Sequence, residues 1–270
     1  MNCCFCGPVK NCGPYLLKVF ENIEKMASLF DDYSIVIYYD RSTDNTLEIL
    51  REYQIKNPKL IFYVNSKPLS PYRTHNIAMG RNFCLKYIRQ NIQKFPFFIM
   101  MDFDDVNCKE VNIEPLRKSL LRDDWDGLSF NTSPYYYDIW GLSIHPYYFS
   151  YNHFNDSYNY SIKIKDYIMN ILTSLKPGQL LPCTSSFNGF SIYRTNKFLN
   201  TYYDGRVRND LFTKKQIETH AKAQKSRKMI YVNYGNVNGF HEDCEHRAFH
   251  KMAIQNSGAR ILISPEIIFK

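Results

Sequence analysis

Two aspartates that lie two positions apart follow a buried apolar segment in the middle of the chain. The run Phe97–Met101 is entirely apolar, and Asp102 and Asp104 come directly after it. Such a short apolar run predicts a strand buried on both faces of a mostly parallel sheet. Because side chains alternate along a strand, the two carboxylates point the same way while Phe103 turns back. Paired carboxylates repel each other unless a cation lies between them, and Mg²⁺ and Mn²⁺ bind carboxylate together with phosphate oxygens. The pattern therefore predicts a metal–diphosphate site, although an acidic turn after a strand gives the same short pattern.

Three further side chains could act at the same edge of the sheet. Asp40 ends the apolar strand Tyr33–Tyr39, where a carboxylate can accept a hydrogen bond from a nucleoside base or a ribose hydroxyl. Arg73 and Arg81 are about two helical turns apart, so both can lie on one helix face and offer planar guanidinium groups to phosphate. The alternatives are a plain turn residue for Asp40 and solvated surface charges for the two arginines.

A second cluster of ionisable side chains lies between Gly239 and His250. It precedes or begins a helix whose apolar face includes Phe249 and which Gly258 ends. Negative charge is favourable in the first turn of a helix, which is a purely structural explanation for the acids. Three acids and three histidines within ten residues nevertheless exceed what a surface helix needs; they are Glu242, Asp243, Glu245, His241, His246 and His250.

The elements that position these groups alternate between strands and helices. We expect strands near residues 5–11, 33–39 and 60–64, with amphipathic helices between them and a further helix from Arg73 onwards. A β-α-β-α-β order predicts a right-handed, doubly wound, mostly parallel sheet flanked by helices. The carboxyl ends of its strands, and with them Asp40 and Asp102, share one edge.

Composition limits the remaining possibilities. A chain of 270 residues with 44% hydrophobic residues can form one large domain, 1–270. The absence of a signal pattern and of any apolar run near the roughly 18 residues of a membrane span predicts a soluble, cytoplasmic protein. The net charge of +8 is concentrated in Arg206–Arg208 and Lys214–Lys228, which lack interleaved aromatic residues, so we expect a solvated face and no nucleic-acid partner. The cysteines of the first strand are expected to be small apolar core residues, with a zinc site the less favoured alternative.

The order of these motifs resembles that of nucleotide-sugar-dependent glycosyltransferases of the GT-A fold. The resemblance spans residues 5–106 and recurs in the carboxyl-terminal third. It is based on four segments in a fixed order: Pro-Val-Lys-Asn from Pro8, Tyr-Asp-x-Ser-Thr-Asp-Asn-Thr from Tyr39, Arg-x-x-x-Ile-Ala-x-x-Arg-Asn from Arg73 and Met-Asp-Phe-Asp-Asp from Met101. Within the fold, the chain looks similar to single-domain enzymes of large DNA viruses and microbes and, distantly, to fungal capsule mannosyltransferases; if viral, it would act in the host cytoplasm or with the virion.

The resemblance implies roles for residues in both halves of the chain. In a nucleotide-binding half, 1–106, Asp40 would contact the nucleoside, Arg73 and Arg81 the diphosphate, and Asp102 and Asp104 would hold Mn²⁺ or Mg²⁺. Residues expected beside the UDP- or GDP-linked sugar donor are Pro8, Val9, Lys10, Phe103, Asn188 and Gly189.

In an acceptor-binding half, 107–270, the resemblance implies a base at either Asp243 or Glu245. His246, or with less support His241 or His250, would complete the metal site. Asp138 and Trp140, in the aromatic segment that follows the strand after Trp125, are expected near the acceptor.

These observations predict a metal-dependent glycosyltransferase, either a hexosyl- or an N-acetylhexosaminyltransferase, acting on a glycan or glycoprotein. Two alternatives stay open. A sugar-phosphate nucleotidyltransferase would share the sheet but should carry a Gly-rich loop after the first strand, where only Gly7 stands here. An inactive sugar-binding scaffold would not need both the paired aspartates and the acid–histidine cluster.

Overall fold

The apolar runs of the first half form the parallel part of one eight-stranded sheet. The computed structural model describes residues 1–150, 157–223 and 242–270. The strands of the first half pair in parallel in the order β3-β2-β1-β4, and the predicted strand over 97–101 has those bounds. Their ranges are β1 (Asn2–Val9), β2 (Asp32–Tyr39), β3 (Leu60–Val64) and β4 (Phe97–Met101).

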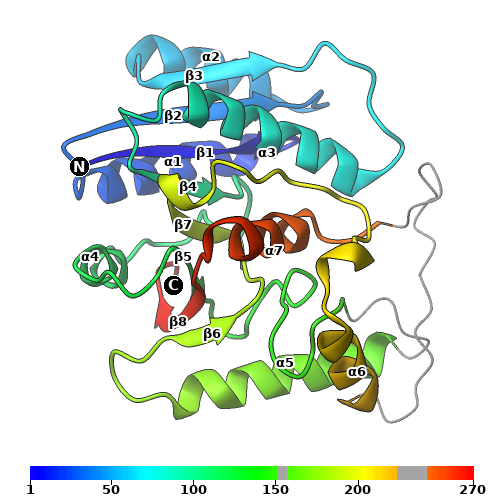
Figure 1. Cartoon of the computed structure of the whole chain (residues 1–270). Coiled ribbons are helices and arrows are strands. Elements are labelled where there is room, and N and C mark those ends of the chain that lie inside the picture. Colours follow the sequence, from blue (N-terminus) through cyan, green and yellow to red (C-terminus); the bar gives the residue numbers. More distant parts are fainter. Residues whose placement is uncertain (151–156, 224–241) are drawn as a thin grey trace.

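Helices connect these strands and cover both faces of the sheet (Figure 1). The first helix, α1 (Gly13–Ala27), buries Leu16, Phe20 and Ile23 of its apolar stripe, and α2 (Thr46–Lys56) packs beside it. The third helix, α3 (Arg73–Gln90), packs on β1 and β2. This confirms the predicted doubly wound arrangement.

The second half completes the sheet with strands of mixed direction. The order continues β7-β5-β8-β6, with β7 antiparallel to both β4 and β5 and β6 antiparallel to β8. The sheet is therefore mostly, but not entirely, parallel. The elements are α4 (Glu114–Leu120), β5 (Gly127–Asn131), α5 (Ser157–Ser174), β6 (Leu181–Cys183), β7 (Phe190–Arg194), α6 (Lys214–Ala223), α7 (Glu245–Ser257) and β8 (Ile261–Ile267).

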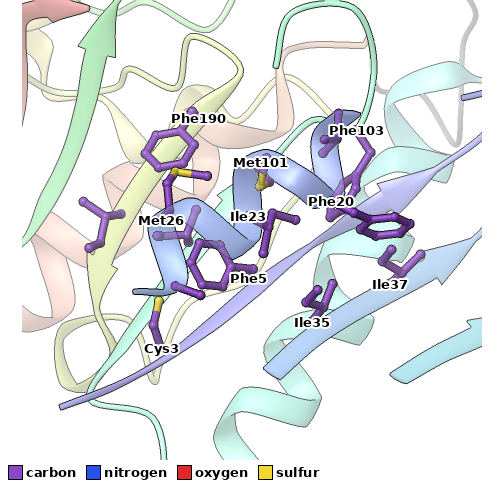
Figure 2. Packing of buried hydrophobic residues seen from close by; sticks show 14 of the residues in the cluster. Cys3, Phe5, Phe20, Ile23, Met26, Ile35, Ile37, Met101, Phe103 and Phe190 are labelled. Carbon is purple, nitrogen blue, oxygen red and sulfur yellow. The ribbon is translucent and has the colours of Figure 1, made fainter. Parts of the chain in front are cut away.

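Alternate side chains of the central strands divide between two hydrophobic cores. On the α1 face, Cys3 and Phe5 of β1 pack with Met101 of β4, as Figure 2 shows. On the α3 and α7 face, Cys4 and Cys6 pack with the apolar residues of those helices. All three cysteines of β1 are fully buried, so they serve as the small core residues that the sequence predicted.

The described part of the polar segment 204–230, residues 204–223, contains regular structure. It includes a short 3-10 turn, Asn209–Leu211, and α6. Arg206 and Arg208 both form ion pairs with Asp204. Residues 224–230 of this segment, together with His241, lie outside the described residues. No helix in the part of the chain that the structure describes combines the length and the apolar character that crossing a bilayer requires.

Candidate active site

A cavity of about 550 Å³ opens at the carboxyl ends of β1, β2 and β4. The amino-terminal parts of α3 and α7 and the loop after β5 complete its walls. Residues from all the predicted motifs line it, although those motifs are far apart in the sequence. The predicted site residues among them are Pro8, Val9, Lys10, Asp40, Arg73, Arg81, Asp102, Phe103, Asp104, Asp138, Trp140, Glu245 and His246.

The end of β4 places the paired aspartates at the floor of this cavity. The backbone N–H of Asp102 donates to the Gly189 carbonyl at 2.9 Å, and its carbonyl accepts from the Asn107 side chain at 2.8 Å. One oxygen of Asp104 accepts from the backbone N–H of Val106 at 3.2 Å. Burial and the negative charge of Asp102 raise the pKa of Asp104 to about 7. Asp104 has no ion-pair partner among the described residues, and an unpaired carboxylate beside a second one is the condition under which the two bind a divalent cation.

Arg81 joins the two acidic clusters across the cavity. Its Nη2 donates to Asp102 Oδ1 and its Nε to Glu245 Oε1, each at 2.9 Å. The guanidinium also lies 4.5 Å from the centre of the Phe187 ring. Burial alone would lower the pKa of Arg81, but the charges of Asp102 and Glu245 outweigh it and raise that pKa. Two of the three guanidinium nitrogens thus hold carboxylates, whereas the sequence predicted contact with a diphosphate.

One side of the cavity is formed by the ends of β1 and β2. Asp40 accepts hydrogen bonds from the Asn65 side chain at 3.1 Å and from the Arg41 backbone at 3.0 Å. Lys10 Nζ lies 3.9 Å from its other oxygen. Arg73, at the start of α3, is exposed and faces the same space. Asn65, which orients the Asp40 carboxylate, had no signal in the sequence.

The Asn188–Gly189 turn supports the site from behind and does not line the cavity. Asn188 has a left-handed backbone (φ 58°), and its Oδ1 accepts from the backbone N–H groups of Tyr137 and Asp138, both at 2.8 Å. Gly189 (φ 80°) has no room for a side chain, because a Cβ would lie 2.7 Å from Val106 Cγ1. The turn thus supports the backbone of two loops, and its direct contact with the donor stays a prediction.

The structure separates the two acids that the sequence left as alternatives for the base. Asp243 is buried away from the cavity and accepts a hydrogen bond from Arg247 Nε at 2.8 Å. The same guanidinium donates to the carbonyls of Trp140 and Leu142, so this pair holds the loop after β5. Glu245 does line the cavity.

His246 lines the cavity but does not join the paired aspartates. Its ring stacks on Phe187 with centroids 3.7 Å apart, and its Nε2 lies 3.5 Å from Glu245 Oε1. Burial and the positive charge of Arg81 lower its pKa well below the ordinary value. Within the described ranges, no group of three or more His, Cys, Asp and Glu side chains could hold a metal ion. The role of His246 as a third ligand stays a prediction, as does that of His250, which is buried between Ser185 and Tyr193.

A match to a family model shows the protein family to which this chain belongs. The model of glycosyl transferase family 2 matches residues 4–176, which is more than half of the chain. The chain belongs to glycosyl transferase family 2. Its sheet and crossovers have the GT-A fold of that class of enzyme. The narrower likeness to viral and fungal enzymes stays a prediction.

The chain is also similar to two solved structures. S. aureus TarS 1–349 in complex with UDP is 17% identical, with 85% of this chain and 57% of that chain covered and a TM-score of 0.41. The mannosyltransferase PcManGT from Pyrobaculum calidifontis, in complex with GDP-Man and Mn²⁺, is 11% identical. The match covers 99% of this chain and 55% of that chain, with a TM-score of 0.46. The chain thus spans a little over half the length of each. No protein with a curated description matches it.

Several residues of the family 2 site were not foreseen. Phe187 and the segment Leu69–Pro71 line the cavity, and Arg247 anchors one of its walls. Phe187 stands just before the Asn-Gly pair, but nothing in its type or spacing distinguishes it from the core aromatic residues of this Phe-rich chain. Only the antiparallel insertion of β7 beside β4 brings it under Arg81.

Proposed function

We propose that this protein is a metal-dependent glycosyltransferase that moves a sugar from a nucleoside diphosphate donor to an acceptor hydroxyl of a glycan or glycoprotein. One observation supports this most directly: a single cavity collects the ends of three parallel strands and the start of α7, with Asp40, Asp102, Asp104 and Glu245 on its walls. A nucleoside diphosphate sugar needs groups for a nucleoside, a diphosphate and a sugar in one continuous space.

The roles of the residues follow from their places in the cavity. Asp40, held by Asn65, is positioned to accept from the nucleoside, and Lys10 and Arg73 are the cations available to the diphosphate. Asp102 and Asp104 would hold Mn²⁺ or Mg²⁺. Such an ion, when bound, neutralises negative charge on the departing diphosphate.

The proposal also assigns different roles to the two halves of the chain. The four parallel strands of 1–106 present the donor groups, and 107–270 supplies the loop after β5 and the start of α7. These latter elements form the wall opposite the strand ends, where an acceptor would enter. Membership of glycosyl transferase family 2 favours this reaction over nucleotidyl transfer or a sugar-binding scaffold.

A melting experiment with nucleotide sugars tests the proposal without knowledge of the acceptor. UDP-N-acetylglucosamine and GDP-mannose are added with and without Mn²⁺, and the melting temperature is followed. A ligand at 100 times its Kd stabilises the folded state by about 2.7 kcal/mol, so binding gives a measurable increase. We expect an increase that requires Mn²⁺ for at least one donor.

Two aspartate variants sharpen this test. Asp104→Asn should abolish the Mn²⁺-dependent increase, whereas Asp105→Asn should keep it, because Asp105 is exposed and does not line the cavity. If no nucleotide sugar shifts the melting temperature of the unmodified protein, or if both variants behave alike, the proposed function is wrong.

A further inference from the structure

A second cavity, of about 270 Å³, lies beside the first, between the loops that follow β4 and β5 and one side of α5. Tyr137 lines both cavities, and Asp105 and Val106, which come directly after the paired aspartates, line the second. Burial, followed by the negative charges of Asp102 and Asp104, raises the pKa of Tyr137, so its hydroxyl lies close to both carboxylates. A molecule in the second cavity would therefore adjoin the reacting groups of the proposed site.

The second cavity collects aromatic side chains that folding leaves exposed. Four tyrosines are exposed among the described residues, and two of them, Tyr135 and Tyr137, line this cavity with 60% and 53% of their surface exposed. Tyr136 between them is fully buried, and its hydroxyl forms a hydrogen bond with Ser186 Oγ at 2.6 Å. The buried ring anchors the segment, so its two neighbours are held outward. Binding a ligand on such rings costs little conformational entropy.

Two lysines add positive charge to the same cavity. Lys109 Nζ donates to the Ser133 carbonyl at 3.1 Å, and Lys165 Nζ, from α5, lies 5.4 Å from the centre of the Tyr135 ring. Both lysines line the cavity, and neither forms an ion pair with any of the described residues. Asp105 is the only acid among the described residues that line it. The charge left over favours a negatively charged ligand, as does the net charge of +8 of the whole chain.

Tyrosine rings and lysines together suit a sugar that carries a negative group. The C–H face of a sugar ring packs on an aromatic ring, and its hydroxyls reach the polar tip of a tyrosine. An ammonium group forms charge-assisted hydrogen bonds with carboxylate or phosphate. Sites for drug-sized ligands have roughly 300–1,000 Å³, so the volume of the second cavity favours one sugar unit over a longer chain.

We propose that the second cavity binds an anionic sugar unit of the acceptor, next to the unit that receives the transferred sugar. Tyr135 and Tyr137 hold the ring, and Lys109 and Lys165 bind its negative group. The acceptor is therefore a glycan of more than one unit, in which a neighbouring unit carries a carboxylate or a phosphate. This proposal rests on the proposed function and names the class of its acceptor.

Binding of small sugars tests the second cavity without the complete acceptor. The first cavity is filled with UDP or GDP and Mg²⁺, so that anions cannot bind there. Methyl glucuronide and glucose 6-phosphate are then titrated, with methyl glucoside as the neutral sugar and inorganic phosphate as the anion without a ring. Saturation-transfer NMR gives each Kd. We expect at least one anionic sugar to bind about 3- to 10-fold more tightly than methyl glucoside and phosphate. The tighter of the two identifies carboxylate or phosphate as the acceptor's group.

Variants show whether the sugars bind in the second cavity. The double variant Lys109→Met and Lys165→Met should weaken the anionic sugar about 3- to 10-fold and leave methyl glucoside unchanged. Tyr135→Ala should weaken both kinds of sugar about 2- to 10-fold without affecting phosphate. Asp105→Asn removes the acid and should strengthen binding of the anionic sugar. Lys163→Met is the control, because Lys163 is exposed on α5 outside the cavity, and it should change no Kd.

Replacing Mg²⁺ by paramagnetic Mn²⁺ relates the bound sugar to the active site. Because paramagnetic relaxation falls steeply with distance, the signals of the anionic sugar should broaden when Mn²⁺ and the nucleotide are both bound. Equal affinity for neutral and anionic sugars, no effect of the lysine variant, no broadening, or no binding of any sugar would overturn the proposal. Phosphate binding as tightly as the anionic sugars would also overturn it, since that is a simple anion site. Failure of the unmodified protein to bind any nucleotide or nucleotide sugar would instead contradict the proposed function.

Discussion

Arg81 is the residue on which the two acidic clusters of the cavity depend. Its side chain is only 4% exposed and lies between Asp102, which follows β4, and Glu245 of α7. The carboxylates come from positions 143 residues apart in the sequence, so this cation also links the two halves of the chain. Its third nitrogen, Nη1, is buried with no partner among the described residues.

Replacing Arg81 should be costly because it would leave two carboxylates close together without their cation. We expect Arg81→Met to lower the free energy of unfolding by about 3 to 5 kcal/mol, as measured by urea denaturation. Arg117→Met is the control, since Arg117 forms an exposed ion pair with Glu114; it should change that free energy by no more than about 0.5 kcal/mol. Equal effects of the two substitutions would contradict the structural role of Arg81.

The turn Asn188–Gly189 is the element that fixes the loops on either side of the cavity floor. Its carbonyl at Gly189 accepts from Asp102, and its Asn188 amide holds Tyr137 and Asp138. Both turn residues have positive φ, which Asn and Gly adopt more easily than other residues. Asn-Gly is thus required here by the backbone as well as by hydrogen bonding.

Two glycines with nearly the same φ separate backbone strain from crowding. Gly178→Ala meets only Arg122 Nη1 at 4.0 Å, so it should cost about 1 to 2 kcal/mol of unfolding free energy from the left-handed backbone alone. Gly189→Ala also places a Cβ against Val106 and should cost about 1 to 3 kcal/mol more. Urea unfolding measures both.

Binding of nucleotide sugar, followed by the melting temperature, gives a second measurement for the same two variants. Because the Gly189 carbonyl positions Asp102, Gly189→Ala should weaken the Mn²⁺-dependent melting increase with nucleotide sugar. Gly178→Ala should leave that increase unchanged. A Gly189→Ala variant as stable as Gly178→Ala would show that the turn is not crowded.

At the scale of the whole molecule, the layer of α5, α6 and the loop after β5 depends on buried polar groups. His220 of α6 is 2% exposed and accepts a hydrogen bond from the backbone N–H of Tyr148 at 2.9 Å. Burial, followed by the positive charge of Arg247, lowers the pKa of His220 to about 3. The ring is therefore neutral in the folded protein over most of the acidic range.

This histidine should make the fold sensitive to acid. Below its ordinary pKa of about 6.5 the unfolded chain binds a proton at His220 that the folded chain does not. Stability therefore falls as the pH decreases from about 6.5 towards 3, by up to about 1.4 kcal/mol per pH unit, and is unaffected above that range. His220→Gln should reduce this slope in urea unfolding measured from pH 7 to pH 4. The exposed His145 provides the control, since His145→Gln should leave the slope as it is.

The first half of the fold could be predicted from the sequence because its signals are local. The apolar run at 97–101 and the strand before Asp40 each specify an element within a few residues of themselves. In the second half, Gly258 marks the end of α7 in the same way. Parallel strands bring their carboxyl ends to one edge, so the meeting of Asp40 with Asp102 followed from the order of elements.

The partners of the site residues were decided by tertiary structure alone. Glu245 and Asp243 are equally acidic and only two positions apart, yet the start of α7 turns one to the cavity and the other to Arg247. The alternating residues after Asn188-Gly189 indicate a strand, but no local pattern indicated that this strand, β7, pairs antiparallel with β4. That pairing places Phe187 under Arg81 and the Asn188 amide under Asp138. Local sequence patterns determine where a strand ends or a helix begins. Contacts between segments that are distant in the sequence form only when those segments pack together in the folded protein.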